Sequence, residues 1–217
     1  MGEKATGKRQ ISARVEQKRE RARQEILAAA QDILSEGGVE AVTLASVAGK
    51  LSMTKQALYH YFSSKEALLR SLVTKLLDDE IETLLAVIAA PDFGEHSLGK
   101  LIRAFYDHYI NRLDSFRTVY CQSQLHSVAR PALDKDTLVD EINPRTRHLF
   151  DRLENRIASS SASEAERRRT RRLAFIAWTS ALGLVTMLGI ADATNDPLVH
   201  SDQELLDTLA GVFDRVG

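Results

Sequence analysis

Apolar side chains recur every three or four positions along most of this 217-residue chain, a spacing that predicts α-helices rather than strands. The segment that ends near Glu36 is the first example, and one of its faces carries Ile26, Leu27, Ala30, Ile33 and Leu34. Gly37 and Gly38 follow it directly. Because glycine readily adopts the left-handed conformation that ends a helix, we predict a first helix that stops at these two residues.

Two short helices are predicted next. Thr43 is placed to cap a helix that runs to Leu51, because a threonine hydroxyl can accept a hydrogen bond from a free amide at a helix start. Thr54 is placed in the same way before a helix over residues 54–62. The short break at Ser52-Met53 separates the two and predicts a tight turn.

The rest of the chain is also predicted to be helical. Ser63 with Glu66 has the spacing of a capping box, in which each side chain accepts a hydrogen bond from the other residue's amide. Two later pairs repeat this spacing, Ser163 with Glu166 and Ser201 with Glu204. Together with the apolar periodicity, these pairs predict helices over residues 64–90, 97–113, 115–128, 143–157, 163–191 and 201–213.

The run from Leu173 to Ile190 is apolar almost all round and approaches the length of a membrane span. It is interrupted by Thr179, Ser180 and Thr186. A helix of this kind must be buried on more than one side, so we predict a core or interface helix rather than a membrane segment. The small residues that would let a second helix approach closely are Ala177, Ala181, Gly183 and Gly189.

The pattern divides the chain into three parts, and the predicted fold class is all-α. Residues 1–19 are basic and almost free of apolar side chains, which predicts a disordered arm, either a solvated tail or an arm that touches DNA. Residues 20–80 contain the short helices and form a predicted small domain. Residues 81–217 form a larger helical domain.

Charge and cysteine content narrow the function. Residues 1–75 hold 13 Lys and Arg against 8 Asp and Glu, a net charge of +5, whereas residues 76–217 hold 16 against 22, a net charge of −6. This asymmetry is expected when only one end of a chain touches a polyanion. Cys121 is the only cysteine, so no disulfide can form within the chain. With a polar N-terminus that lacks the apolar core of a signal peptide, this predicts a cytoplasmic protein.

The most informative segment is Thr43–Phe62, because two short helices joined by a tight turn are typical of the DNA-binding helix-turn-helix. The second helix enters the major groove, where lysine can reach guanine acceptors and glutamine can pair with two atoms of adenine. Helix starts add free amides and a positive dipole end for phosphate. We predict DNA contacts from Thr43, Thr54, Lys55, Gln56, Tyr59, His60 and Lys65, the alternative being a merely solvated helix face.

Residues 20–80 resemble the DNA-binding domain of the TetR family of regulators. The positions in register with the family's pattern are Leu44-Ala45, Val47-Ala48, Thr54, Leu58-Tyr59, Tyr61-Phe62, Lys65-Glu66 and Leu68. The run LYHYFSSKE is far more specific than a generic helix-turn-helix. Ser52 departs from the pattern, since a glycine is usual at this turn.

The resemblance implies a helix-turn-helix domain followed by a ligand-binding and dimerisation domain of about six helices. It implies a homodimeric repressor on a palindromic double-stranded DNA operator, released when a small-molecule effector changes the spacing of the two DNA-binding heads. The two C-terminal helices of each subunit would form the dimer interface. The last of them offers Leu205, Leu206, Leu209, Val212 and Phe213.

Residues 81–217 carry no comparably specific motif. A ligand pocket between their helices would be lined by some of the aromatic side chains and by a few polar groups that orient the ligand. The candidates are Tyr109, Gln124, His126 and Trp178, although most aromatic residues of this region are expected to be ordinary core.

Other functional classes find little support. Cys121 and His126 are not at helical contact spacing, and no Ser-His-Asp or paired-carboxylate signature appears. The histidines at positions 96, 108, 126 and 148 are too scattered to predict a metal site. We therefore predict no catalytic residue, no metal and no cofactor. The basic run over residues 166–172 is predicted to be a solvated helix face paired with acids, rather than a second nucleic-acid patch.

Overall fold

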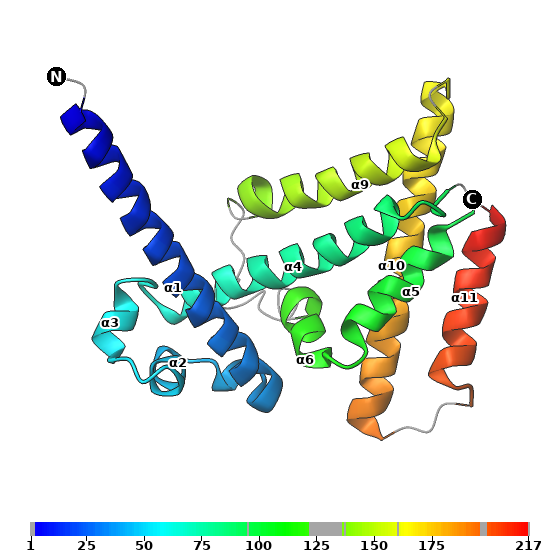
Figure 1. Ribbon diagram of the computed structural model, residues 1–217. Coiled ribbons are helices and arrows are strands. Elements are labelled where there is room, and N and C mark those ends of the chain that lie inside the picture. Colours follow the sequence, from blue (N-terminus) through cyan, green and yellow to red (C-terminus); the bar gives the residue numbers. More distant parts are fainter. Residues whose placement is uncertain are drawn as a thin grey trace. The chain divides into compact units, whose positions relative to one another are not determined.

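The computed structural model describes residues 3–94, 96–121, 136, 138–159, 161–195 and 199–216. These residues form helices and turns, with no strand among them, which confirms the predicted all-α class. The chain divides into two compact units, Met1–Lys75 and Leu76–Gly217 (Figure 1). This division falls a few residues before the predicted one at residue 80.

Helix α1 spans Glu3–Ala41 and differs from the prediction at its start. The sequence predicts a disordered arm over residues 1–19, but helical backbone already begins at Glu3. The physical reason is composition, since Ala, Arg, Lys, Gln and Glu have high helix propensity and form helix without an apolar face. Residues 14–20 are accordingly both helical and exposed.

Helix α1 is broken near its C-terminal end where the sequence predicts. Gly38 has φ of 70° and ψ of −179°, a conformation that glycine alone adopts readily. The chain continues into two short helices, α2 (Leu44–Lys50) and α3 (Lys55–Tyr59). Helix α3 is shorter than the predicted span, which ends at Phe62, because only turns follow Tyr59.

The turn between α2 and α3 is closed by Ser52 in the left-handed conformation, with φ of 54°. The Ser52 amide donates to the Gly49 carbonyl at 3.1 Å, and the Met53 amide donates to the Ala48 carbonyl at 2.9 Å. These are the two bonds of a Schellman motif, which satisfies the last carbonyls of a helix. A serine thus occupies the position that favours glycine, and for a residue with a Cβ this conformation costs about 1–2 kcal/mol.

The caps predicted at Ser163 and Ser201 are confirmed, and the cap predicted at Ser63 is corrected. Helix α4 (Lys65–Ala89) is capped by Ser64, whose hydroxyl accepts from the Ala67 amide at 3.2 Å, one residue later than the predicted Ser63. Both serines have the same capping chemistry, so composition alone did not decide between them. The two later boxes form as predicted, with amide-to-carboxylate distances of 2.7 Å for Ser163 with Glu166 and 2.8 Å for Ser201 with Glu204.

The core of the first unit lies beneath the helix-turn-helix. Leu58 of α3 is fully buried, and so are residues from the other three helices, among them Ile26, Leu34, Val47 and Leu68. Arg23 of α1 holds the segment after α3, because its guanidinium lies 4.5 Å from the centre of the Phe62 ring and donates to the Tyr61 carbonyl at 2.7 Å. The short helix α3 is therefore fixed from below and at its end.

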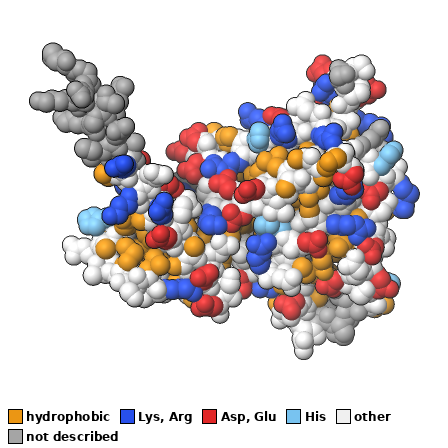
Figure 2. Space-filling view, viewed as in Figure 1, with side chains coloured by type: hydrophobic (Ala, Val, Ile, Leu, Met, Phe, Trp, Pro, Cys, Tyr) orange, Lys and Arg blue, Asp and Glu red, His pale blue; other side chains and the backbone are white. Residues whose placement is uncertain are grey.

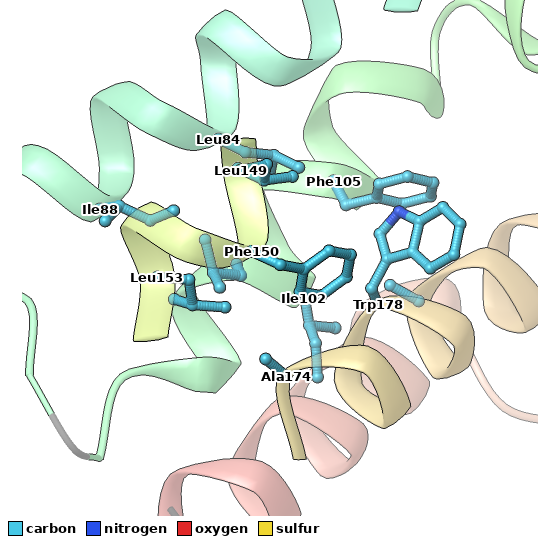
Figure 3. A pocket seen from close by; sticks show the side chains of 11 residues that line it. Leu84, Ile88, Ile102, Phe105, Leu149, Phe150, Leu153, Ala174 and Trp178 are labelled. Carbon is cyan, nitrogen blue, oxygen red and sulfur yellow. The ribbon is translucent and has the colours of Figure 1, made fainter. Parts of the chain in front are cut away.

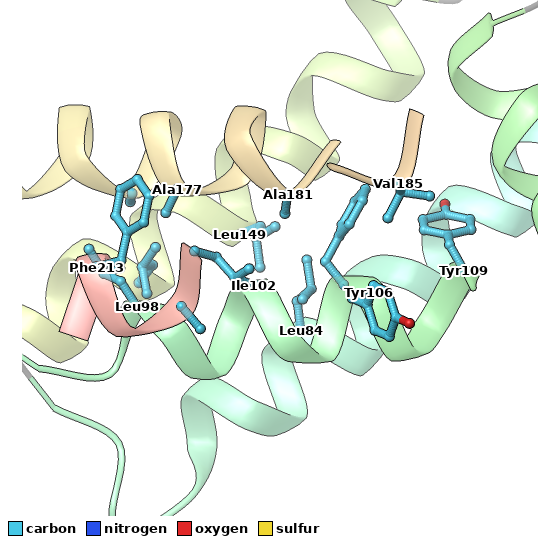
Figure 4. Close-up of a cluster of buried hydrophobic side chains, with 14 of the residues drawn as sticks. Leu84, Leu98, Ile102, Tyr106, Tyr109, Leu149, Ala177, Ala181, Val185 and Phe213 are labelled. Carbon is cyan, nitrogen blue, oxygen red and sulfur yellow. The ribbon is translucent and has the colours of Figure 1, made fainter. Parts of the chain in front are cut away.

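The second unit contains the rest of α4 together with α5 (Leu98–Tyr109), α6 (Leu113–Phe116), the π-helical turns η1 (Arg117–Cys121) and η2 (Leu138–Ile142), α9 (Asn143–Ile157), α10 (Glu164–Thr194) and α11 (Asp202–Val216). Helix α10 packs on α5, α9 and α11, and α11 packs on α5. Their buried side chains form one core that includes Ile102, Ala181 and Phe213 (Figure 4).

Helix α10 begins with a basic segment that the structure pairs with acids, as predicted. Arg168 lies 2.6 Å from Glu164, and Arg171 lies 2.6 Å from Asp151. Arg167 lies 3.6 Å from Glu154. Basic and acidic side chains are likewise mixed over the visible face of the molecule (Figure 2). This supports a solvated helix face over a second nucleic-acid patch.

The remainder of α10 is unusually apolar for its exposure. Among the residues described, it is the one helix that is long and apolar enough to cross a membrane by length and composition. It packs on three neighbouring helices, which is typical of a core helix, but only 28% of its apolar window is buried inside the chain. Most of this apolar segment is thus not covered by the chain's own described residues.

The strained position of Ser52 gives the first testable prediction. Ser52→Val should lower the free energy of unfolding by about 1 kcal/mol beyond the cost that serine already carries, because a β-branched side chain is disfavoured more strongly at positive φ. Ser52→Gly should keep or slightly raise that free energy, since it relieves the same strain. Urea unfolding of the purified variants measures both values. Equal stability of the two variants would contradict the left-handed conformation.

Candidate DNA-binding surface and effector cavity

Helix α3 presents a set of polar side chains to solvent. Lys55, Gln56, Tyr59 and His60 are all exposed, while Leu58 between them is fully buried in the core of the first unit. Tyr59 is 46% exposed, which is unusual for so large an aromatic side chain, and the Lys55 ammonium lies 5.9 Å from the centre of its ring. The structure thus places three of the seven predicted DNA contacts on one short helix and His60 directly after it.

The two predicted threonines lie at the starts of the two short helices. The Thr43 hydroxyl accepts from the Ser46 amide at 3.0 Å, and the Ser46 hydroxyl accepts from the Thr43 amide at 3.0 Å, so α2 has a full capping box. The Thr54 hydroxyl accepts from the Ala57 amide at 3.1 Å. Its proton can still be donated, and a phosphate oxygen is a suitable acceptor at such a helix start.

Lys65, the last predicted DNA contact, lies at the first position of α4. Its ammonium lies 3.7 Å from the carboxylate of Glu40, whose side chain is 88% exposed. A solvent-exposed ion pair of this kind contributes at most about 1 kcal/mol, so a DNA phosphate can replace the carboxylate with little loss. Lys65 is therefore available to a polyanion.

In the second unit, an acidic side chain lies at the centre of an aromatic cluster. Glu80 of α4 is only 2% exposed, and its Oε2 accepts from the Tyr109 hydroxyl at 2.7 Å and from the Tyr120 hydroxyl at 2.6 Å. The Trp178 indole also interacts with this carboxylate. Burial raises the pKa of Glu80 above its usual range, and the hydrogen bonds from the two tyrosines and Trp178 oppose that rise.

The predicted ligand contacts have different roles. Tyr109 is fully buried and binds Glu80, so it positions the acid rather than lining a cavity. Trp178 is partly exposed and lines two cavities. Gln124 and His126 lie outside the described residues. Glu80 and Tyr120 were not predicted as ligand contacts.

A signal for Glu80 is present in the sequence. Glu80 lies on the apolar face of its helix, because it is four residues after Leu76 and four before Leu84, and both leucines are buried. Burying an acid at an apolar position of a helix is costly unless the acid is hydrogen-bonded or functional. The signal was missed because Asp78 and Asp79 lie beside Glu80 and make the segment resemble a solvated acidic run.

Two cavities share a wall in this unit. The larger, here called the Glu80 cavity, has a volume of about 160 Å³ and is lined by Leu77, Glu80, Ile81, Val119, Tyr120, Ile142, Thr146, Leu149, Phe150 and Trp178. The smaller, here called the apolar cavity, has a volume of about 20 Å³ and lies among side chains of α4, α5, α9 and α10 (Figure 3). Leu149, Phe150 and Trp178 border both.

Neither a reactive thiol nor a metal site is seen in the part of the chain that the structure describes. Burial raises the pKa of the Cys121 thiol, which disfavours the reactive thiolate. No group of three or more His, Cys, Asp or Glu side chains in the described residues is placed to hold a metal ion.

Helix α10 exposes an apolar stripe, here called the outer stripe, formed by Ile176, Gly183, Met187 and Ile190. The three hydrophobic side chains are each 50–56% exposed, and the spacing of seven, four and three residues keeps all four positions on one helical face. Thr179 and Ser180 lie in the same region, and both hydroxyls donate to the Ile176 carbonyl, at 3.0 Å and 2.8 Å. Their polar groups are therefore satisfied within the helix itself.

The predicted small residues of α10 face in different directions, which corrects part of the sequence analysis. Ala177 and Ala181 are each 1% exposed and pack into the chain's own core, and Gly189 is buried near Leu113. Gly183 alone of the four is exposed, and a Cβ built on it would have no neighbour within 4 Å. In an almost wholly apolar helix, composition does not reveal which face points outward.

Helix α11 offers a further exposed apolar position. Val212 is 44% exposed, and Leu205 and Leu209 are partly buried against the core. Leu206 and Phe213, which the sequence assigns to the same interface, are 2% and 6% exposed and belong to the chain's own core. The outward side of α11 is therefore narrower than predicted.

Parts of this sequence are similar to those of known bacterial regulators. Residues 26–72 match the family described as bacterial regulatory proteins, tetR family. The HTH-type transcriptional repressor KstR2 of Rhodococcus jostii (strain RHA1) is 27% identical over 128 residues, which cover 59% of this chain and 61% of that protein. The matched region thus spans about three fifths of the length of that relative.

Solved structures share the fold over most of the chain. A TetR/AcrR-family transcriptional regulator from Thermobifida fusca has a TM-score of 0.60 with 19% identity, covering 90% of this chain and 97% of its own. The transcriptional regulator FadR from Bacillus subtilis, solved in complex with stearoyl-CoA, has a TM-score of 0.59 with 16% identity, covering 88% of this chain and 96% of its own. At these identities the likeness concerns the fold alone.

Proposed function

Because this chain belongs to the TetR family of bacterial transcriptional regulators, we propose that it is a repressor that binds a palindromic operator as a homodimer and leaves it when a small-molecule effector binds. The observation that carries the proposal is the exposure of Lys55, Gln56 and Tyr59 on a helix anchored by the buried Leu58. Short helices that present such side chains at a helix-turn-helix dock in the major groove.

The DNA-binding role of each side chain follows from its chemistry. Gln56 can donate to and accept from one adenine, and Lys55 can donate to guanine, so these residues would read base edges. Thr43, Thr54, Tyr59 and Lys65 would hold phosphates and so position the helix. His60, exposed at the end of α3, adds a further polar contact on the same face. The net charge of +5 over residues 1–75 favours approach to DNA in general.

Dimerisation is supported by the exposed apolar face of the two C-terminal helices. The outer stripe and Val212 place hydrophobic side chains in solvent, which is unfavourable on an isolated subunit. A two-fold axis would pair each stripe with its copy, and Gly183 would allow close approach of the two α10 backbones. Such a dimer has two recognition helices and suits an inverted repeat in DNA.

Effector control is supported by the cavities of the second unit. They combine apolar walls with a small number of polar groups, the usual composition of ligand sites. The Bacillus subtilis relative was solved with a bound acyl-CoA, so the same fold accommodates small molecules. A protein that binds operator DNA would act in the cytoplasm, where bacterial DNA is found.

The DNA contacts are tested by alanine substitution. An operator is first selected from random duplexes, and binding is then measured by fluorescence anisotropy at several salt concentrations. Lys65→Ala should weaken binding to every sequence and lower the salt slope by about one unit, since one phosphate contact is lost. Gln56→Ala should change preference at one position of each half-site by about 1–3 kcal/mol.

A control for this test is Lys100→Ala, which removes an exposed lysine of the second unit that pairs with Asp92. It should leave operator affinity unchanged. If the triple variant Lys55→Ala, Gln56→Ala, Tyr59→Ala folds normally and binds the operator as well as the wild type, α3 is not the recognition helix.

The dimer interface is tested at Gly183. Gly183→Leu should fold normally, because the added side chain meets open space in the subunit and leucine favours helix by up to about 1 kcal/mol over glycine. It should nevertheless sediment as a monomer and lose operator affinity, because the bulk keeps the two α10 helices apart. Val212→Asp should weaken the dimer as well, since a dimer would bury its unpaired carboxylate.

Gly183→Ala is the matched control and should keep the dimer while raising thermal stability. Tight dimers of both Gly183→Leu and Val212→Asp, with native affinity for DNA, would place the interface elsewhere. Recovery of the wild type only in detergent or membrane fractions would instead favour a membrane role for α10.

A further inference from the structure

Glu80 is an acid whose negative charge has no cationic partner in the described part of the second unit. It forms no ion pair with a described Lys or Arg, and all three groups known to approach it, Tyr109, Tyr120 and Trp178, are neutral donors. His108 packs edge-on against Tyr109 at 4.6 Å, but burial lowers its pKa to about 4, so it is uncharged at neutral pH. Arg112 lies 3.4 Å from His108, and its charge acts on Tyr109 rather than in an ion pair with Glu80. Among the described residues, the ionised form of Glu80 therefore has no direct counter-charge, and its burial disfavours that form.

The hydrogen bonds from the two tyrosines leave acceptor capacity on the Glu80 carboxylate. Both tyrosine hydroxyls donate to the same oxygen, Oε2, and a carboxylate has about four acceptor positions over its two oxygens. Glu80 is itself one of the residues that line the Glu80 cavity. A donor group of a ligand can therefore reach the carboxylate without displacing either tyrosine.

Three aromatic side chains contribute to the walls of the Glu80 cavity. Tyr120, Phe150 and Trp178 all line the Glu80 cavity, with ring centres 6.0 Å apart for Tyr120 and Trp178 and 6.3 Å apart for Phe150 and Trp178. Aromatic faces attract cations through their quadrupole, most strongly for tryptophan and where water is excluded. A carboxylate among aromatic rings is a combination that recognises an ammonium group.

We propose that the Glu80 cavity binds a monocationic amphiphile, whose ammonium or amidinium head contacts Glu80 and whose apolar body lies against Leu149, Phe150 and Trp178. This inference rests on the proposed effector-controlled function, for which it supplies the chemical class of the effector. An anionic ligand is disfavoured at the same place, because like charges in a site of low dielectric repel strongly.

The apolar cavity gives the body of the ligand room to extend. It adjoins the Glu80 cavity through the wall of Leu149, Phe150 and Trp178, and the eleven side chains that line it are all apolar or aromatic (Figure 3). Its volume of about 20 Å³ is enough for little more than one water molecule. A longer alkyl chain would enter it only as the shared aromatic side chains rotate.

The test compares three probes with the same alkyl chain and different head groups: octylammonium, octanol and octanoate. Trp178 is the only tryptophan of the chain and borders both cavities, so its intrinsic fluorescence reports binding at this place. We expect octylammonium to bind at least about ten-fold more tightly than either other probe, comparable to one hydrogen bond to a charged group.

Two variants assign the preference to Glu80. Glu80→Gln keeps the size and an acceptor for the tyrosines but removes the charge, and it should reduce the octylammonium preference over octanol to about equality. Glu82→Gln removes an exposed acid from the same helix and should leave the preference unchanged. The head-group order in the wild type needs no variant and remains a test if Glu80→Gln fails to fold.

The outcomes separate this inference from the proposed function, because DNA release is measured independently by anisotropy. Octylammonium binding that depends on Glu80 supports the proposed ligand class. If the protein with bound octylammonium stays on the operator, that result would count against effector control alone. Preferred binding of octanoate or octanol, or equal binding of all three probes, would overturn the inference while leaving effector control open to another ligand.

Discussion

The structure of the second unit depends on the burial of the inner face of one apolar helix, α10. Helix α10 is too apolar to lie on a surface, and its inner face, with Ala177, Ala181 and Val185 each 0–1% exposed, forms the core against α5 and α11. The same helix contributes Trp178 to both cavities. The outer stripe is left exposed, and the proposed dimer would bury it.

The helix-turn-helix of the first unit was predictable because its sequence carries local signals that agree with each other. The caps at Thr43 and Thr54, the break at Gly38 and the buried Leu58 each fix one feature within a few residues of chain. Ser52 is different, because no local signal predicts its left-handed conformation. In the sequence it appears only as a serine at the turn position where glycine is usual. Local chemistry determines a short motif of this kind almost completely.

The second unit was less predictable because its site is assembled from distant parts of the chain. Tyr109 lies 29 residues after Glu80 in the sequence, and Tyr120 lies 40 residues after it. No local spacing connects the acid with either tyrosine. The sequence also does not show that Ala177 and Ala181 face the chain's own core. A helix that is apolar all round has no polar face that would indicate which side points to solvent. Such features follow from packing rather than from sequence pattern.

The placement of Trp178 and Gly183 on one helix suggests how an effector would reach the dimer interface. They are five residues apart, about 7.5 Å along the axis, and one lines the cavities while the other lies on the outer stripe. A ligand that displaces Trp178 would bias the position of α10, and an interface built on close helix approach is sensitive to small shifts. Helix α4 carries Glu80 and, near its start, Lys65. If the proposed ligand site is correct, α4 and α10 would each connect it with a surface that DNA or the partner subunit would use. Effector control requires that the ligand bind one arrangement of these elements more tightly than the other, and a buried acid that gains a counter-charge provides such a difference.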